Sequence, residues 1–325
     1  MKIKTICILA VAAVAMAGCE STRIDTSQIF VPEEGGITFT QVTDLADDSP
    51  IIPNITYDGQ RLRWWANPYF AISPDNQKFA YISTHNGRRN IFVKSFGSRT
   101  GAQQRTFSGN VQDPCFSPSG DTLCFTQYDY PYYNIFLTSA SQGSIMQQVT
   151  SGTVYDYAPA FSPDGSLVFF HRAQNNHYFI WSYNRHTGVF STYCYGLTPS
   201  PINDKEFLCS RQNSYNNYEI WRVNYVNGSE NLVLSNKDRS FTTASMSPDG
   251  KWILFAANTM KKPGVPENID IYVVRADGSQ LTQLTYHHGH DLSPVWSPDG
   301  KSIYFLSQRG TTAGLYNIWK MEFNL

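Results

Sequence analysis

The sequence predicts an all-β fold, a six-bladed β-propeller of four-stranded blades that is closed by an N-terminal strand at residues 37–44. Three observations lead to this fold. A Ser-Pro-Asp-Gly motif or a close variant recurs along the chain, and an isoleucine followed by an aromatic residue recurs once between neighbouring copies. A lone strand pattern also stands before the first repeat. Periods of roughly 40 to 50 residues with short strands are typical of propeller blades.

The first signal is the turn motif. Its copies begin at residues 73, 117, 162, 247 and 297, at intervals of 44, 45, 85 and 50 residues. A degenerate copy at 200–204, Ser-Pro-Ile-Asn-Asp, divides the long interval and brings the count to six. Serine at the first position, proline at the second and glycine at the fourth favour a type I turn. Each motif is therefore expected to join two antiparallel strands.

The second signal gives the same count independently. The aromatic residues that follow an isoleucine are Phe92, Phe136, Trp181, Trp221, Tyr272 and Trp319. The last repeat divides into three strands, at 293–297, 302–307 and 316–323, whereas earlier repeats carry a fourth, such as the one at 280–286.

The third signal explains the missing strand. Residues 39–43 match residues 281–285 nearly one for one, so the segment 37–44 is expected to be a fourth strand without a blade before it. Pairing with the last repeat would close the ring, and closure removes the open sheet edges of a linear array.

The repeat resembles that of a known family. Ser-Pro-Asp-Gly-Lys at 247–251 and 297–301, then Asn-Ile-aromatic, and Leu-Thr-Gln-Leu-Thr at 281–285 are similar to the TolB-type β-propeller repeat. The resemblance covers residues 37–325 and implies the propeller fold. Because the repeat is structural, it implies no particular activity. Only a tether at 19–36 is expected before the propeller, where TolB itself has an α/β domain.

The N-terminus has the pattern of an exported lipoprotein. Lys2 and Lys4 precede an apolar run at 6–18, which is shorter than the ~20 residues that a membrane-spanning helix needs. The run ends in Met-Ala-Gly before Cys19, which resembles the lipobox of bacterial lipoproteins. Residues 1–18 are therefore expected to be a signal peptide and Cys19 the lipidated residue. Glu20 implies the outer membrane, with the leaflet left open.

Composition narrows the class of partner. The formal net charge is −1 and only 16% of residues are charged, so no nucleic-acid partner is predicted. Aromatic residues reach 14%, with 20 tyrosines. Aromatic faces beside hydrogen-bonding groups suit sugar rings or extended peptides.

Candidate binding residues lie in the loops between the second and third strands of each blade and between consecutive blades. We call the side that carries these loops the top face. Loops on a rigid scaffold are where binding residues concentrate. The ends of the second strands are predicted to form a polar ring of Ser83, Gln127, His171, Arg211, Ala257 and Ser307. The candidate ligand-binding residues of the top face are Trp64, Trp65, Gln127, Tyr130, Tyr132, His171, Arg211 and His290.

Other chemistry-bearing residues have two interpretations. His171, His288 and His290 are weak candidates for a metal site, although solvated loop histidines are the simpler interpretation, and no cofactor is predicted. Asp113, Asp156 and Asp291 recur at similar places and are expected to brace the loops. The cysteines after Cys19 are Cys115, Cys124, Cys194 and Cys209. Because repeat alignment gives three of them core positions, free thiols are expected.

Two functions remain open. The first is an outer-membrane lipoprotein, without catalysis, whose propeller binds an envelope protein or a glycan through its top face. The alternative is a polysaccharide-acting hydrolase or lyase, metal-dependent in one version, with its site in the propeller funnel. No Gly-x-Ser-x-Gly motif, phosphate-binding glycine loop or Cys-x-x-Cys pair favours an enzyme.

Overall fold

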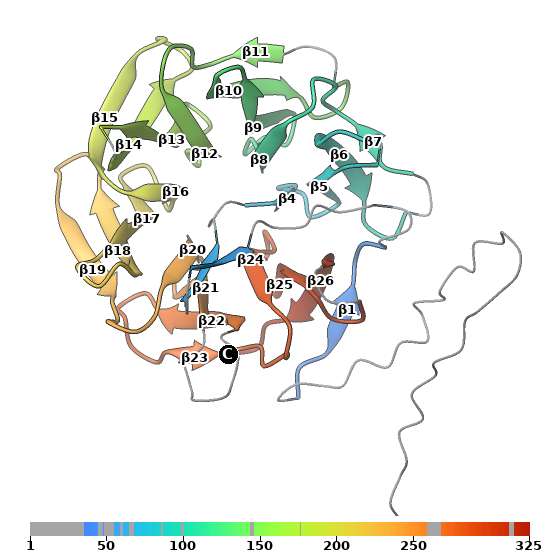
Figure 1. The fold of residues 1–325 in the computed structure, drawn as a ribbon, viewed down its shortest axis with the longest axis vertical. Helices are drawn as coiled ribbons and strands as arrows, with labels where there is room; N and C mark the ends of the chain where they lie inside the picture. The colour runs from blue at the N-terminus through green and yellow to red at the C-terminus, as the bar shows by residue number, and fades with distance from the viewer. Residues whose placement is uncertain are drawn as a thin grey trace, which may run out of the picture.

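The computed structural model is a closed ring of six four-stranded antiparallel sheets, the predicted β-propeller (Figure 1). It describes residues 36–44, 48, 55–58, 61–64, 68–85, 87–98, 101–143, 146–175, 177–258, 268–311 and 315–325, without the side chains of 55–58, 61–64 and 146. The predicted signal peptide, Cys19 and nearly all of the tether lie outside these residues.

The blades follow one another along the chain, and each of the first five runs from its innermost to its outermost strand. Blade one contains β4 (Phe70–Ile72), β5 (Lys78–Ser83), β6 (Asn90–Ser95) and β7 (Gln103–Gln104). Blade two contains β8 (Val111–Phe116), β9 (Thr122–Asp129), β10 (Tyr132–Ser139) and β11 (Met146–Gln148). Blade three contains β12 (Tyr155–Phe161), β13 (Leu167–Gln174), β14 (His177–Asn184) and β15 (Phe190–Tyr195).

The second half of the ring repeats this order. Blade four contains β16 (Leu197–Pro201), β17 (Glu206–Gln212), β18 (Tyr218–Asn224) and β19 (Glu230–Leu234). Blade five contains β20 (Phe241–Met246), β21 (Trp252–Asn258), β22 (Ile269–Arg275) and β23 (Thr282–Gln283). Blade six contains β24 (Asp291–Trp296), β25 (Ser302–Ser307), β26 (Asn317–Glu322) and β1 (Phe39–Gln41). A separate hairpin contains β2 (Ile55–Asp58) and β3 (Arg61–Trp64).

The predicted closure is confirmed. β1 pairs antiparallel with β26, with Phe39 opposite Met321 and Gln41 opposite Trp319. Beyond the strand, Thr43 Oγ1 accepts a hydrogen bond from the Ile318 amide at 2.8 Å and donates one to Asn317 Oδ1 at 2.9 Å. The outer position of the last blade is thus filled by a segment from the start of the propeller.

The Ser-Pro-Asp-Gly segments form the predicted turns. In the copy at 247–250, the Gly250 amide donates to the Ser247 carbonyl at 2.8 Å, and the hydroxyl of Ser247 donates to Asp249 Oδ1 at 2.6 Å. This hydrogen bond from Ser247 is the main reason that the pKa of Asp249 is lowered. The turn is therefore held by its own side chains.

A β-bulge interrupts the inner strand of five blades. The residue at the bulge has a positive φ in each case, at Asp113, Ala158, Thr198, Thr243 and Ser293. Opposite the bulge, on the second strand, lies a buried residue: Phe125, Phe170, Cys209, Phe255 or Phe305. The bulges were not predicted, although Pro114, Pro159, Pro199 and Pro294 signal them. Proline cannot donate a ladder hydrogen bond and is found inside sheets mainly at edges and bulges.

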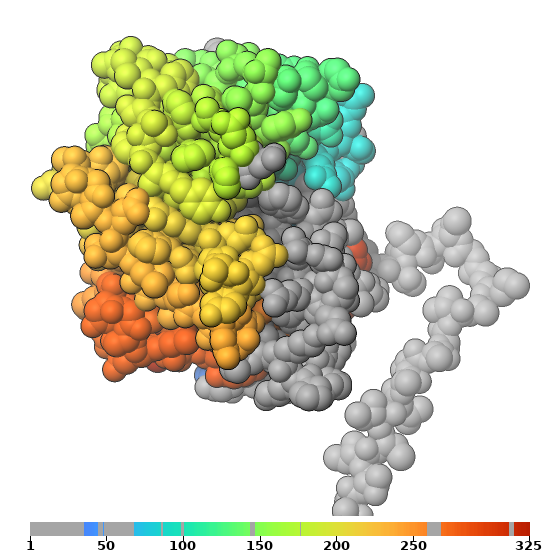
Figure 2. All heavy atoms as spheres, turned by 60° about the vertical axis from the view of Figure 1, so that its left-hand side comes forward, coloured from blue at the N-terminus to red at the C-terminus, as the bar shows by residue number. Residues whose placement is uncertain are grey.

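The core lies between neighbouring blades. Each second strand is largely buried, and its aromatic residues pack against those of the next blade, as Phe169 does against Phe207 at 5.6 Å between ring centroids. Figure 2 shows the outer wall, where blades in green, yellow and orange follow one another in continuous contact. No helix among the described residues has the length and hydropathy needed to cross a bilayer.

Candidate functional site

A layer of tyrosines crosses the top face from blade two to blade three. We call it the tyrosine surface, and its members are Tyr128, Tyr130, Tyr132, Tyr133, Tyr155 and Tyr157. The end of β9, the turn after it and the start of β10 supply the first four, and the start of β12 supplies the last two. Because these strand ends meet where the two blades adjoin, residues up to 29 positions apart in the chain become neighbours.

The rings contact one another in a continuous network. Ring centroids lie 4.9 Å apart for Tyr128 and Tyr133, 5.0 Å for Tyr133 and Tyr157, and 5.3 Å for Tyr132 and Tyr155. Tyr130 is 85% exposed and Tyr155 39% exposed, while the other rings of the surface are half-buried. The tyrosine surface therefore combines a packed base with two projecting rings.

Among the described residues, the hydroxyls of these tyrosines have no protein partner. Within the described part of the chain, none of the six hydroxyls makes a hydrogen bond to another protein group. Burial raises the pKa of Tyr133 and Tyr157 above the usual value for tyrosine, so both remain protonated at neutral pH. Each hydroxyl can therefore donate and accept a hydrogen bond with a ligand.

His171 supports the tyrosine surface from beneath. It is buried, and its ring lies 5.5 Å from that of Tyr157 and 5.4 Å from that of Tyr178. Its Nδ1 accepts a hydrogen bond from the Thr198 amide at 3.2 Å, which joins blade three to the bulge of blade four. Burial lowers the pKa of His171 to about 3, so the ring is neutral at physiological pH.

The strand register corrects the predicted polar ring. Val111 pairs with Gln127 and the equivalent residue of blade three, Asp156, pairs with Arg172. In the predicted ring, His171 was placed as the equivalent of Gln127 by comparing the repeats. The register gives that position to the next residue, Arg172. Side chains alternate across a strand, so His171 points to the opposite face.

Two other predicted residues of this ring, Gln127 and Arg211, already make hydrogen bonds to other side chains of the protein. Gln127 is 9% exposed and accepts a hydrogen bond from Ser108. Arg211 is 8% exposed, donates to both carboxylate oxygens of Glu230 at 2.7 and 2.9 Å, and lies 4.6 Å above the ring of Trp221. These contacts brace the fold, which was not foreseen because Glu230 is on the outer strand.

The three histidines considered for a metal do not converge. His171 is buried in blade three, whereas His288 and His290 precede blade six, on the other side of the ring. His288 is exposed, and His290 Nδ1 is 2.9 Å from Asn268 Oδ1. Among the described residues, no three His, Cys, Asp or Glu side chains are grouped so that they could hold a metal ion.

The remaining predictions have mixed outcomes. Asp113 was expected to brace a loop but joins strands instead: its Oδ2 accepts hydrogen bonds from Thr126 Oγ1 on β9 at 2.8 Å and from the Ala158 amide at the bulge of β12 at 3.0 Å. The backbone of Trp64 belongs to β3, but the structure describes neither its side chain nor any part of Trp65. The four cysteines at 115, 124, 194 and 209 are free thiols, as predicted.

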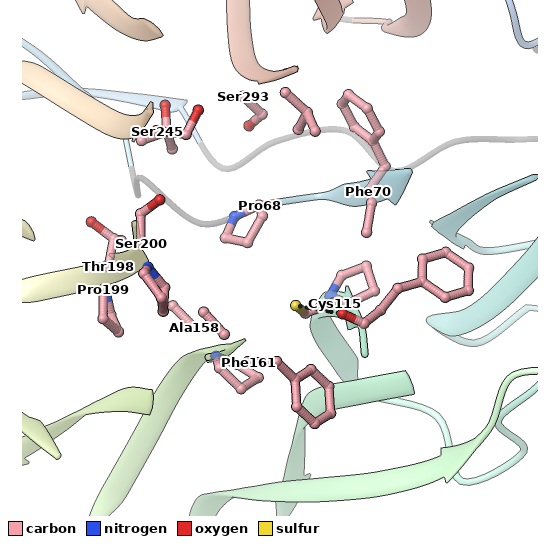
Figure 3. A pocket seen from close by; sticks show the side chains of 18 of the residues that line it. Pro68, Phe70, Cys115, Ala158, Phe161, Thr198, Pro199, Ser200, Ser245 and Ser293 are labelled. Atoms are coloured by element: carbon pink, nitrogen blue, oxygen red, sulfur yellow. Dashed lines mark hydrogen bonds between the residues drawn. The ribbon is translucent and has the colours of Figure 1, made fainter. Parts of the chain in front are cut away.

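A cavity of about 320 Å³ lies at the centre of the ring. Inner strands of all six blades line it, and Figure 3 shows Cys115, Thr198, Ser245 and Ser293, from four different blades, around one space. Proline, alanine and phenylalanine side chains make most of the wall. The Ser245 hydroxyl is buried and has no hydrogen-bond partner in the described structure.

Comparisons with known proteins agree with this architecture. The family model of the TolB beta propeller domain matches residues 67–266. The Tol-Pal system protein TolB of Bordetella pertussis is 25% identical over 285 residues, covering 86% of this chain and 61% of that protein. That of Francisella tularensis subsp. mediasiatica is 29% identical over 93 residues, 29% of this chain and 20% of that protein. The matched part is thus less than two thirds of either relative.

Solved structures show the same fold at low identity. TolB from Acinetobacter baumannii superposes with a TM-score of 0.60 and 17% identity, covering 77% of this chain and 64% of that one. An oligogalacturonate lyase from Vibrio parahaemolyticus superposes with a TM-score of 0.54 and 11% identity, covering 89% of this chain and 97% of that one. At such identities the likeness concerns the fold alone.

Proposed function

Because the chain belongs to the TolB β-propeller domain family, we propose that it is a binding module of the cell envelope whose tyrosine surface holds a segment of another protein. The observation that carries the proposal is the set of six adjoining tyrosines whose hydroxyls have no partner in the described part of the chain. Tyrosine supplies a large apolar contact and a polar tip at low entropic cost, and it is enriched in protein interfaces.

The orientation of the rings favours a protein segment over a glycan. A sugar stacks on a flat, open aromatic face. Tyr155 and Tyr157 stack on each other at 6°, while Tyr132 and Tyr155 meet edge to face at 64°, and Tyr128 and Tyr130 at 89°. Mixed orientations of this kind, with hydroxyls at the ring tips, suit the amides and carbonyls of an extended chain. A glycan is the alternative that the experiment below distinguishes.

The proposal includes an envelope location with a lipid anchor on Cys19 in the outer membrane. The supporting observations are the basic start, the apolar run and the small residues before Cys19. The relatives that match are named as proteins of the Tol-Pal system, which is consistent with an envelope role. Labelling cells with an alkyne analogue of palmitate tests the anchor: the label should appear on the wild type and vanish in Cys19→Ser. An unlabelled wild type would remove the anchor from the proposal.

No catalytic step is assigned to the top face. The predicted alternative, a hydrolase or lyase acting on polysaccharide, needs titratable groups that converge on one reacting atom. His171 is buried and neutral, and Arg211 is paired with Glu230. These contacts favour structural roles for both residues.

Photo-crosslinking tests the binding proposal. A benzophenone amino acid at position 130 should capture a protein partner in intact cells, whereas the same group at position 286 should not. Tyr286 is the matched control because it is 60% exposed and lies far along the ring, before blade six. Capture at position 130 should also disappear in a Tyr132→Ala/Tyr155→Ala background that folds normally by circular dichroism.

With the captured partner purified, the same double substitution should weaken its binding at least about tenfold. Equal capture at positions 130 and 286, or binding that the double substitution leaves unchanged, would contradict the proposal. Absence of a protein adduct, together with tyrosine-dependent retention on envelope polysaccharide, would assign the surface to a glycan.

A further inference from the structure

Two of the four cysteines that follow Cys19 meet between blades three and four. Cys194 is half-buried on β15, the outer strand of blade three, and Cys209 is fully buried on β17, the second strand of blade four. Cys194 packs against the apolar cluster that contains Cys209, and the two thiols are within hydrogen-bonding reach. The two side chains therefore belong to different sheets but contact each other.

The local sequence makes room for this contact. Cys209 stands where the other bulged blades have a phenylalanine, at Phe125, Phe170, Phe255 and Phe305. The connection from β15 to the next blade passes beside it, since a Cβ on Gly196 would lie 3.0 Å from the Cys209 sulfur. A small side chain at 209 and a glycine at 196 together let the backbone after Cys194 approach the sulfur.

A cation lies beside the pair. Arg211 interacts with both thiols, and its position is fixed by the two hydrogen bonds to Glu230 and by the ring of Trp221. The residue is more than nine-tenths buried, and its Nε has no acceptor in the described structure. A buried guanidinium N–H of this kind next to a sulfur atom would stabilise a thiolate.

We propose that Cys194 and Cys209 are a redox-active thiol pair, and that a disulfide-bearing oxidant converts them into a cystine that links blades three and four. Cys194 is the attacking group because it is the more accessible of the two. The hydrogen bond from the Cys209 thiol and the charge of Arg211 lower the pKa of Cys194, whereas the same contact and burial raise the pKa of Cys209.

The reaction is a double thiol–disulfide exchange. The Cys194 thiolate attacks one sulfur of the oxidant, and a mixed disulfide forms as the first oxidant thiolate leaves. The Cys209 thiol then loses its proton and attacks the Cys194 sulfur, releasing the second oxidant thiolate. In total, the two cysteines lose two protons and two electrons, and the disulfide of the oxidant is reduced to two thiols.

The chain contains its own control pair. Cys115 and Cys124 lie directly opposite each other on β8 and β9, so they are also neighbours. Burial raises the pKa of Cys115 to about 11 and that of Cys124 well above its usual value, and the opposing charge of Arg185 at Cys124 is outweighed. The Cys115 thiol donates to the Phe116 carbonyl at 3.4 Å. Proximity is thus shared by both pairs, but only the pair beside Arg211 contains a thiol whose pKa is lowered.

The test uses the folded full-length chain and oxidised glutathione. After treatment, denaturation, alkylation and digestion, mass spectrometry should find the peptides that contain Cys194 and Cys209 joined, with Cys115 and Cys124 alkylated. In Cys209→Ala the reaction should stop at glutathione on Cys194, because no second thiol resolves the mixed disulfide. In Cys194→Ser, Cys209 should acquire no glutathione.

The effect of the positive charge of Arg211 on Cys194 is tested separately, by the rate at which Cys194 is alkylated. Arg211→Gln should slow alkylation of Cys194 by iodoacetamide at pH 7 by about tenfold, while Arg211→Lys retains most of the rate. Formation of a Cys115–Cys124 bond first, four thiols that all survive the oxidant, or glutathione on Cys209 in Cys194→Ser would each overturn the proposal.

Discussion

At the scale of single residues, burial decides which titratable groups affect stability. His171 is neutral because burial depresses its pKa to about 3, and its Nδ1 needs a lone pair to accept the hydrogen bond from Thr198. A histidine of this kind contributes stability that is fully present above its unfolded pKa of about 6.5 and is lost as the pH falls towards its folded value. Through His171 alone, mild acidification should therefore lower the stability of the wild type.

His171→Gln tests this directly. Glutamine keeps an acceptor but does not titrate, so the free energy of unfolding should fall less between pH 7 and pH 5 than in the wild type. Urea denaturation at several pH values measures the difference between the two slopes. His186→Gln is the control, because His186 lies in an exposed turn. Parallel slopes for His171→Gln and wild type would contradict the buried, neutral assignment.

Asp291 and Arg309 form a fully buried ion pair, with 2.6 Å between Arg309 Nη1 and Asp291 Oδ1. Burial raises the pKa of Asp291 from 3.8 to about 6, with Arg309 opposing the shift. A raised carboxyl pKa means that the contribution of this group to stability is greatest below pH 3.8 and is lost as the pH rises through about 6.

Arg309→Met should lower the free energy of unfolding by about 3 kcal/mol at pH 7, because the Asp291 carboxylate then has no buried counter-charge. The deficit should shrink below pH 6, where Asp291 becomes protonated. Lys320→Met is the matched control, since the Lys320–Glu322 pair is largely solvated and its loss should cost less than about 1 kcal/mol. If the loss of stability in Arg309→Met did not change with pH, Arg309 would not act by compensating the charge of Asp291, and the prediction would be wrong.

At the scale of elements, β1 is a short strand whose side-chain contacts with blade six are made mainly by Phe39. The ring of Phe39 lies 6.0 Å from that of Phe305, and the guanidinium of Arg309 lies 4.2 Å from the Phe39 centroid. Thr40, the next residue, is exposed and points away from these groups. Closure of blade six therefore depends on one face of a strand of three residues and on the hydrogen bonds of Thr43 just after it.

Phe39→Ala should lower the free energy of unfolding by about 2 kcal/mol, through lost apolar burial and the lost contact with Arg309. Thr40→Ala in the same strand should change it by less than about 0.5 kcal/mol. Thermal denaturation of both variants measures the difference. Equal melting temperatures for Phe39→Ala and wild type would show that β1 does not hold blade six closed.

At the scale of the whole molecule, a closed ring couples each blade to two neighbours. Clusters of buried residues bridge adjacent blades, and one of them spans blades one, five and six, including the closure. Local opening of one blade would expose apolar surface on both sides.

We therefore expect one cooperative transition in chemical denaturation. Far-UV circular dichroism, which follows all blades, and tryptophan fluorescence, which follows the surroundings of a few side chains, should give the same midpoint. Two resolved midpoints would mean that part of the ring unfolds independently of the rest.

The sequence allows this overall arrangement to be predicted because its signals are local and repeated. Each turn motif is complete within four residues, and the match between residues 39–43 and 281–285 identifies the closing strand. The position of His171 was wrong by one residue, since side chains alternate along a strand and a single slip reverses the face. Counting repeats thus predicts the number of blades more reliably than it predicts the face of a strand to which a given side chain points.

The side-chain partnerships could not be predicted in the same way. Arg211 with Glu230, Cys194 with Cys209, and Tyr133 with Tyr157 each join residues from different strands or blades. Which side chains meet depends on the register of strands within one sheet, as for Arg211 and Glu230, or on how two twisted sheets pack, and no local pattern encodes either. The clustering of tyrosines at 128–133 and 155–157 was visible, but the contacts within the tyrosine surface were not.

The closing strand also sets an order of events in time. The hydrogen bond from the Ile318 amide to Thr43 joins residues 275 positions apart, so β1 is synthesised long before its partner exists. The other blades can assemble in sequence from neighbouring segments, while β1 must wait unpaired. Contacts between such distant residues are slow to form, and completion of the ring is expected to be the last and rate-limiting step of folding.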